Sequence, residues 1–301
     1  MKILLLGKNG QVGWELQRAL SVLGEVVALD RCPVATEYGN LVGDLSDLVG
    51  LRETIRSFAP DVIVNAAAYT AVDKAESERD LARTVNALAC QVMAEEAKRL
   101  DAWLVHYSTD YVFDGKGITP WKETDTVAPV NHYGATKLEG ERMIEASGCK
   151  HLIFRTSWVY AGRGNNFAKT MLRLAKDRSS LNVIADQIGA PTGAELLADV
   201  AVAALQQALV RPELSGIYHL APTGDTSWHA YAKFVIEFAR AHGESLVVEA
   251  VNPIATTEYP TPASRPLNSR LNTEKLRDSF SLHLPDWQRG VTRMLMEALN
   301  K

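Results

Sequence analysis

Short apolar runs alternate with amphipathic stretches through the first half of the chain. We expect strands where the runs are nearly continuous, at 2–6, 25–29, 61–65, 102–107 and 150–155. Amphipathic spacing in the stretches between them predicts helices near 11–23, 47–58, 80–100 and 132–147. Apolar strands that alternate with helices are typical of a parallel sheet covered on both faces. The pattern therefore predicts an α/β fold with a doubly wound parallel sheet.

The regular alternation of predicted strands and helices ends at about residue 155. Beyond a loop at 162–166, we expect helices near 166–177, 194–209, 228–241 and 286–299, and strands near 181–184 and 216–220. Proline restricts both itself and the residue before it, so the proline-rich segment 259–266 is expected to be irregular. We predict a first domain over 1–155 and a smaller mixed α/β part over 156–301, with segments that return to the first domain.

Composition and charge argue against several classes of binding partner and against a membrane protein. The chain has 301 residues, of which 47% are hydrophobic and 23% charged, and a net charge of −4, which disfavours nucleic acids and anionic membranes as partners. No uncharged stretch approaches the roughly 20 residues of a membrane span, and no cleavage region follows the first apolar run. Cys32, Cys90 and Cys149 are widely spaced, which predicts reduced thiols in a cytoplasmic protein.

A glycine-rich turn follows the first predicted strand. Gly7, Gly10 and Gly13 have one more residue between the first two glycines than the usual dehydrogenase fingerprint. Such a turn brings the backbone close to a pyrophosphate and aims a helix N-terminus at it. An ordinary strand-to-helix turn is the alternative interpretation. The position between a strand and a helix favours a Rossmann-type dinucleotide-binding domain over 1–155.

Further cofactor candidates follow the next strands. Asp30 closes the second strand, where an acidic side chain can hold the ribose hydroxyls of NAD. Arg31 and Lys8 could instead meet the 2′-phosphate of NADP, so NADH and NADPH both stay open. The small residues of the segment 65–70 let a cofactor lie close to the backbone, and Asp44 is a weaker candidate for the adenine.

Tyr133 and Lys137 form the only Tyr-x-x-x-Lys in the chain, and their spacing places them on one face of a helix. A tyrosine with a pKa of about 10 is a poor acid–base catalyst at neutral pH, and a nearby ammonium lowers that pKa. Alone, the pair is typical of a solvated helix face. Ser108, Thr109 and Asp110 follow the predicted strand 102–107, where a hydroxyl can hold a substrate carbonyl while Tyr133 supplies the proton. Together with the glycine turn, these residues predict a hydride-transfer enzyme.

These motifs resemble those of the extended short-chain dehydrogenase/reductases. The resemblance covers nearly the whole chain and is carried by the segments 7–13, 65–68, 106–113, 133–137, 155–160, 186–192 and 264–269. More narrowly, the chain resembles the branch that reduces dTDP-4-dehydro-β-L-rhamnose to dTDP-L-rhamnose for cell-surface polysaccharide, using NADPH or NADH. This resemblance implies a dTDP-sugar as substrate and a substrate-binding role for much of 156–301.

The resemblance also implies roles for single residues. Thr109, Tyr133 and Lys137 match the catalytic trio, and Thr109, Asp110 and Trp158 match positions that contact the deoxysugar. The positions that match the cofactor lining are Gln11, Val12, Asp30, Asp44, Leu45, Ala68, Tyr69 and Thr70, with Tyr107 near the cofactor. The flat indole of Trp158 can stack on a sugar ring. Arg265 could pair with the diphosphate, because a guanidinium forks onto phosphate oxygens.

Some relatives hold a divalent ion at a dimer contact, and Glu15 and Glu195 resemble the carboxylates involved. Their oxygens would suit Mg²⁺ in a structural role, and a homodimer is the corresponding expectation. Glutamates on helix faces are usually just solvated, which is the alternative.

Three other functions are compatible with parts of this pattern. Sugar-nucleotide 4,6-dehydratases carry an acidic residue directly after Thr-Asp, where this chain has Tyr111, so simple carbonyl reduction is favoured. A reductase of another 4-keto sugar nucleotide stays open, because the trio does not fix the C4 epimer. A non-catalytic, nucleotide-binding regulatory subunit is the third alternative, although such proteins need not retain Thr, Tyr and Lys.

Overall fold

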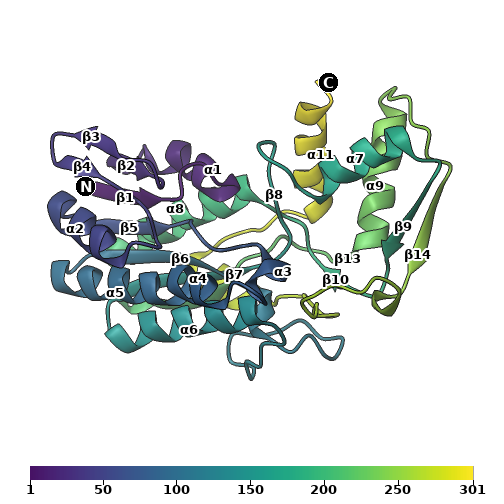
Figure 1. Cartoon of the computed structure of the whole chain (residues 1–301). Coiled ribbons are helices and arrows are strands. Elements are labelled where there is room, and N and C mark those ends of the chain that lie inside the picture. Colours follow the sequence, from purple (N-terminus) through teal and green to yellow (C-terminus); the bar gives the residue numbers. More distant parts are fainter. Residues whose placement is uncertain (301) are drawn as a thin grey trace.

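The computed structural model describes residues 1–300, and a six-stranded sheet forms its larger part (Figure 1). The sheet has the order β12-β7-β6-β5-β1-β2, and every neighbouring pair is parallel. Its strands are β1 (Lys2–Leu6), β2 (Glu25–Leu29), β5 (Val62–Asn65), β6 (Trp103–Thr109), β7 (Lys150–Thr156) and β12 (Gly216–His219). The predicted doubly wound α/β fold is confirmed.

Helices cover both faces of this sheet. On one face lie α1 (Gln11–Leu20), α8 (Ala194–Val210) and α10 (Glu274–Phe280), and on the other lie α2 (Leu48–Phe58), α5 (Ala89–Leu100) and α6 (His132–Ser147). In β1, Ile3 and Leu5 join the first hydrophobic core, whereas Leu4 and Leu6 join the second. Alternate side chains of a strand point to opposite faces, so a strand covered on both faces is apolar throughout.

The smaller part has its own core, beside the sheet in Figure 1. Three helices form it: α7 (Phe167–Asp177), α9 (Trp228–Ala241) and α11 (Trp287–Ala298). Strand β9 (Ser180–Ile184) pairs in parallel with β14 (Ala250–Ile254), and two short pairs join β8 (Val159–Tyr160) to β11 (Thr192–Gly193) and β10 (Ile188–Gly189) to β13 (Thr226–Ser227). Helix α8 and strand β12 follow residue 155 in the chain but pack onto the main sheet.

The remaining elements are short. They are the hairpin of β3 (Val34–Thr36) and β4 (Gly39–Leu41), α3 (Val72–Ala75), α4 (Arg79–Arg83), the π-helical turn η1 (Thr84–Leu88), and the 3-10 turns η2 (Asp110–Val112), η3 (Pro212–Leu214) and η4 (Thr256–Glu258). The single helix predicted over 80–100 is therefore interrupted by η1, and the hairpin, β14 and α10 were not predicted. Within residues 1–300, no helix is long and apolar enough to cross a membrane.

One ion pair is buried between the sheet and α6. The side chains of Arg155 in β7 and Glu141 in α6 are 4% and 1% exposed, and the guanidinium donates three hydrogen bonds of 2.7 to 3.2 Å to the carboxylate. Burying a charge is costly unless it is paired, so each group depends on the other. The pair fixes α6 on β7, and α6 is the helix that carries Tyr133 and Lys137.

We expect Glu141→Gln to lower the free energy of unfolding by about 3 kcal/mol, because it leaves the buried Arg155 charge without its carboxylate. Urea unfolding would measure this change. Glu139→Gln is the matched control, since Glu139 lies on the same helix but pairs with Arg83 at the surface. Equal unfolding midpoints for the two variants would contradict the stabilising role of the buried pair.

Candidate active site

A cleft opens at the carboxyl ends of β1, β2 and β5. From β1 the chain moves to β2 on one side and later returns to β5 on the other, and ligands of open α/β sheets bind at such a reversal. The cleft has a volume of about 680 Å³. Nine of the predicted cofactor positions line it: Gly7, Gly10, Asp30, Arg31, Asp44, Leu45, Ala68, Tyr69 and Thr70. Its lining also includes Asn9, Ser46, Lys74 and Glu78, which the sequence analysis did not select.

The glycine turn forms the floor of this cleft. Gly7 has φ +89°, and a Cβ on it would lie 2.7 Å from the backbone nitrogen of Ala67. Gly10 caps α1 without a side-chain hydrogen bond, so the first amide groups of the helix keep free donors. The backbone therefore fits a pyrophosphate, which needs close approach and unpaired N–H groups. A dinucleotide is the cofactor class that these features suit.

The first residues of α1 are oriented differently from the cleft lining. Gly13 packs against the carbonyl of Gly7, and Val12 packs against the hydrophobic core under α1. The Oε1 atom of Gln11 is buried without a hydrogen-bond partner. None of these three residues lines the cleft, so their contribution to a cofactor site would come from the backbone of the helix start.

Asp30, which follows β2, and Asp44 both line the cleft. Asp30 accepts a hydrogen bond from the backbone of Cys32 at 2.8 Å and another from the side chain of Asn9. Asp44 accepts two from Ser46, at 2.9 and 2.7 Å. Because Arg31 lines the same cleft, both an acidic and a basic partner for the ribose are present, which fits either NADH or NADPH.

Local packing places Tyr133 beside Thr109. Asn131 caps α6 by accepting a hydrogen bond from the backbone of Gly134 at 2.8 Å, and Gly134 lies directly against the carbonyl of Tyr111. The start of α6 thus reaches η2, and the side chains of Tyr133 and Thr109 hydrogen-bond. Burial raises the pKa of Tyr133 to about 12, and the bond to Thr109 opposes this shift. The phenol therefore keeps its proton at neutral pH.

Asp110 lies next to this pair and is 2% exposed. Its Oδ1 atom accepts a hydrogen bond from the Thr109 hydroxyl at 3.2 Å, and its side chain also bonds to Ser269. Its Oδ2 atom is buried without a partner. Burial raises the pKa of Asp110 to about 7, against the opposing hydrogen bonds of Ser269 and Thr109. A group that changes charge near neutral pH thus lies beside the predicted proton donor.

Lys137 lies one turn further along α6 and is 1% exposed. Its Nζ atom donates to the carbonyl of Tyr107 at 2.6 Å and lies 3.0 Å from Nε2 of His106. Burial lowers the pKa of Lys137, which differs from our expectation of an ammonium that acts mainly on Tyr133. Tyr107 contributes that carbonyl, whereas its phenol donates to the Leu197 carbonyl at 3.3 Å, away from the cleft.

Trp158 and Arg265, the predicted substrate-binding residues beyond residue 155, each contact another side chain of the protein. Trp158 has φ +48° and stacks on Trp228, with ring centroids 3.6 Å apart, so one face of its indole is covered. Arg265 pairs with Asp73 at 2.8 Å. Its Nη1 atom is buried without a partner and is the donor that a diphosphate oxygen could satisfy.

Two further residues that support the site were also missed by the sequence analysis. Asn86, in the π-helical turn, accepts a hydrogen bond from the Tyr69 backbone at 2.8 Å and donates to Thr136 of α6 at 3.1 Å. It thereby ties the cleft loop to the helix of Tyr133. Ser269 bonds to Asp110 across the chain. An asparagine within an otherwise apolar helix segment is the signal that could have identified Asn86.

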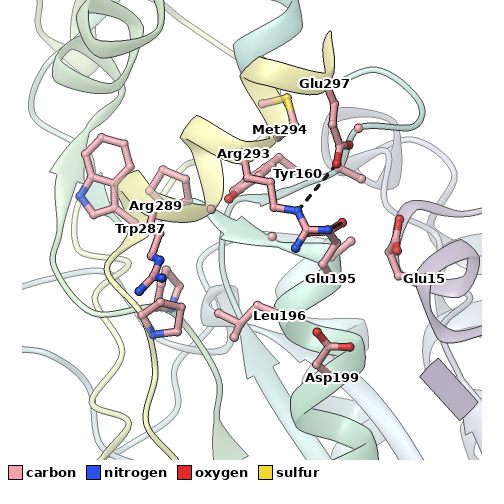
Figure 2. A pocket seen from close by; sticks show the side chains of 18 of the residues that line it. Glu15, Tyr160, Glu195, Leu196, Asp199, Trp287, Arg289, Arg293, Met294 and Glu297 are labelled. Atoms are coloured by element: carbon pink, nitrogen blue, oxygen red, sulfur yellow. Dashed lines mark ion pairs between the residues drawn. The ribbon is translucent and has the colours of Figure 1, made fainter. Parts of the chain in front are cut away.

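Glu15 of α1 and Glu195 of α8 line a second cavity, of about 320 Å³, beside α11 (Figure 2). Burial, followed by the charge of Glu195, raises the pKa of Glu15. Arg293 pairs with Glu195 at 3.3 Å and with Glu297 at 3.7 Å, so a cation is already present. Among residues 1–300, no group of three His, Cys, Asp or Glu side chains could hold a metal ion. These residues therefore do not by themselves fit Mg²⁺, and a metal completed by a second chain stays a prediction.

Fold and site together define a dinucleotide-binding α/β protein of the extended short-chain dehydrogenase/reductase type. The family described as the RmlD substrate binding domain matches residues 1–300. The chain belongs to this family.

Curated relatives and solved structures agree with that assignment. The dTDP-4-dehydrorhamnose reductase of Shigella flexneri is 59% identical over 99% of this chain and 98% of its own length. The enzyme of the same name from Escherichia coli (strain K12) is 58% identical over the same shares. The crystal structure of dTDP-4-dehydrorhamnose reductase from Bacillus anthracis str. Ames in complex with NADP is 35% identical, with a TM-score of 0.86 over 98% of this chain and 99% of that chain.

We expect Gly7→Ala to weaken NADPH binding at least tenfold, because the new Cβ would occupy the space between the glycine turn and Ala67. Calorimetric titration of the protein with NADPH would measure the change. Gly39→Ala is the matched control, since Gly39 also has positive φ, +102°, but nothing lies within 4 Å of its Cβ position. Equal affinities in both variants would show that the turn does not hold the cofactor.

The raised pKa of the Asp110 carboxyl makes the stability of the protein depend on pH. In the folded protein its pKa is about 7, whereas the ordinary value is 3.8. Between these two pH values the carboxyl is ionised in the unfolded chain but protonated in the folded one. The free energy of unfolding therefore falls as the pH rises through this range. The loss amounts to roughly 4 kcal/mol at most. We expect Asp110→Asn to be more stable than the wild type at pH 8 but not at pH 4, in urea unfolding. A stability difference that is the same at both pH values would contradict the raised pKa.

Proposed function

We propose that this chain reduces the C4 ketone of dTDP-4-dehydro-β-L-rhamnose to give dTDP-L-rhamnose, with NADPH or NADH as the reductant. The observation that carries the proposal is the hydrogen-bonded pair of Tyr133 and Thr109, located with the buried Lys137 at the sheet edge that also bears the glycine turn. The activity named for relatives 59% and 58% identical over nearly their full lengths supports the choice of substrate.

The proposed roles follow from the side chains. NAD(P)H, when bound along the glycine turn, supplies the hydride for C4. Tyr133 donates its proton to the oxygen of the reduced carbonyl, because its raised pKa keeps the phenol protonated. Thr109 hydrogen-bonds the same oxygen. Lys137, which the Tyr107 carbonyl holds in place, would donate to the ribose of the nicotinamide.

Asp110 supports Thr109 in this scheme. The Thr109 hydroxyl donates to Oδ1 of Asp110 at 3.2 Å, which holds the threonine side chain in place. Trp158, whose indole stacks on Trp228, would contact the deoxysugar, and the Nη1 atom of Arg265 would donate to the diphosphate.

A cytoplasmic location belongs to this proposal, because the reaction consumes reduced nicotinamide, which cells keep in that compartment. The free thiols of Cys32, Cys90 and Cys149 suit it. A homodimer stays a prediction. So does the role of 156–301 as the main substrate-binding part.

We expect Tyr133→Phe to lower turnover at least a thousandfold, because it removes the proton donor, while the affinity for NADPH changes less than twofold. Absorbance of the reduced nicotinamide measures turnover, and titration measures affinity. Tyr231→Phe is a matched control, since the Tyr231 phenol is buried in the smaller core without a partner. Turnover near the wild-type level in Tyr133→Phe would refute the assigned role.

The substrate assignment has its own test. Steady-state rates would be measured with the dTDP and UDP forms of the keto sugar, each with NADH and NADPH, and the product epimer identified by NMR. The proposal predicts highest kcat/KM for the dTDP sugar and the L-rhamno product. A different C4 epimer would favour a reductase of another sugar, and no nicotinamide oxidation with any of them would favour a regulatory subunit.

A further inference from the structure

The glycine turn between β1 and α1 is fastened to the end of β2. The backbone N–H groups of Gly7 and Lys8 both donate to the Leu29 carbonyl, at 2.9 and 3.1 Å. Leu29 is the last residue of β2, and Asp30 follows it directly. Asn9 is the next residue of the turn, so it lies beside the Asp30 carboxylate, and both side chains line the cofactor cleft.

The side chain of Asn9 donates to this carboxylate. Its Nδ2 group bonds to Oδ2 of Asp30, and the backbone N–H of Cys32 donates to Oδ1 at 2.8 Å. A carboxylate can only accept, so the Asn9 amide must turn its NH2 group toward Asp30. Each oxygen of Asp30 thus has one donor from the protein, and the donor on Oδ2 belongs to an exposed side chain.

The two other acidic side chains of the cleft lining also have donors from the protein. Asp44 accepts two hydrogen bonds from Ser46, and Glu78 accepts one from the Tyr69 hydroxyl at 2.6 Å. A donor on a carboxylate weakens the repulsion that an approaching anion meets there. The cleft can therefore admit a phosphate although three carboxylates line it.

NADH and NADPH differ at one place, the 2′ position of the adenosine ribose, which carries a hydroxyl in NADH and a phosphate in NADPH. A bare carboxylate at the end of β2 accepts from the hydroxyl and repels the phosphate. The Asn9 bond changes both interactions, because it uses an acceptor site of Asp30 and weakens the repulsion of a phosphate. Arg31 lines the same cleft, and its guanidinium can pair with that phosphate.

We propose that Asn9 determines cofactor specificity: by donating to Asp30, it lets this acidic site accept the 2′-phosphate, so that the protein binds NADPH in addition to NADH. Asn9 acts through Asp30 and is therefore a positioning residue. The proposal rests on the proposed function only in taking NAD(P)H as the cofactor, and it does not depend on which sugar is reduced.

The first test compares the wild type with Asn9→Ala in calorimetric titrations with each cofactor, without sugar. We expect the ratio of the NADPH Kd to the NADH Kd to rise about tenfold, because a hydrogen bond to a charged group is lost. The rise should come from weaker NADPH binding, with NADH binding unchanged or tighter. A merely structural role would weaken both cofactors equally, and an unchanged ratio would overturn the proposal.

Two further variants bracket this result. Asn40→Ala is the matched control, since Asn40 is an exposed asparagine of β4 outside the cleft lining, and it should keep the wild-type ratio. Asn9→Asp keeps the shape of the side chain but sets a second carboxylate against Asp30, so it should bind NADPH more weakly than Asn9→Ala. A shifted ratio in Asn40→Ala, or NADPH binding in Asn9→Asp as tight as in Asn9→Ala, would contradict the proposal.

A double-mutant cycle tests whether Asn9 acts through Asp30. In Asp30→Ala the carboxylate is gone, so the addition of Asn9→Ala should leave the ratio of the two Kd values unchanged. If Asn9→Ala shifts the ratio by the same factor in this background, Asn9 acts on the phosphate directly, and the proposed route through Asp30 fails.

Adenosine fragments locate the effect at the ribose. The fragments 5′-AMP and 2′,5′-ADP differ only in the 2′-phosphate, and neither carries a nicotinamide. The proposal predicts that Asn9→Ala shifts their affinity ratio in the same direction and by a similar factor. A shift with the whole cofactors but not with these fragments would overturn it. A wild-type protein that shows these binding ratios but reduces no sugar would count against the proposed function alone.

Discussion

The structure depends on one constraint, which is that all six strands of the main sheet run parallel. Their carboxyl ends therefore meet at a single edge, and the chain reverses its direction of progress there between β1 and β5. The glycine turn, Asp30, Asn65 and Thr109 all follow or end strands at that edge. Residues far apart in the sequence are thereby gathered without any of them having to distort its own element.

Buried polar groups then determine the chemistry at this edge. Asp110, Tyr133 and Lys137 all lose water, and the resulting pKa shifts favour the uncharged form of each. Thr109 and the Tyr107 carbonyl are the groups that hold Tyr133 and Lys137 at this edge. A phenol that keeps its proton suits reduction better than oxidation, because the proton donor must be protonated before the ketone is reduced.

Features that are local in sequence were predictable. Strand and helix positions followed from apolar spacing, and the pairing of Tyr133 with Lys137 on one helix face followed from their separation of one turn. The partners that tune these groups were not predictable, because they come from distant segments. Ser269 reaches Asp110 and Asp73 reaches Arg265 only through the folded chain. The three-residue strands of the hairpin are too short to show a period, and the π-helical turn leaves helical spacing nearly unchanged.

The central claim is that this edge brings a nicotinamide, a ketone and the Tyr133 phenol together for hydride transfer. The most direct measurement supplies NADPH deuterated at the transferable position of the nicotinamide C4 and follows the label in the sugar product by NMR. The account predicts deuterium on C4 of the dTDP-linked deoxysugar and a proton from water on its new hydroxyl. Product without deuterium at C4, or a label at another sugar carbon, would contradict it.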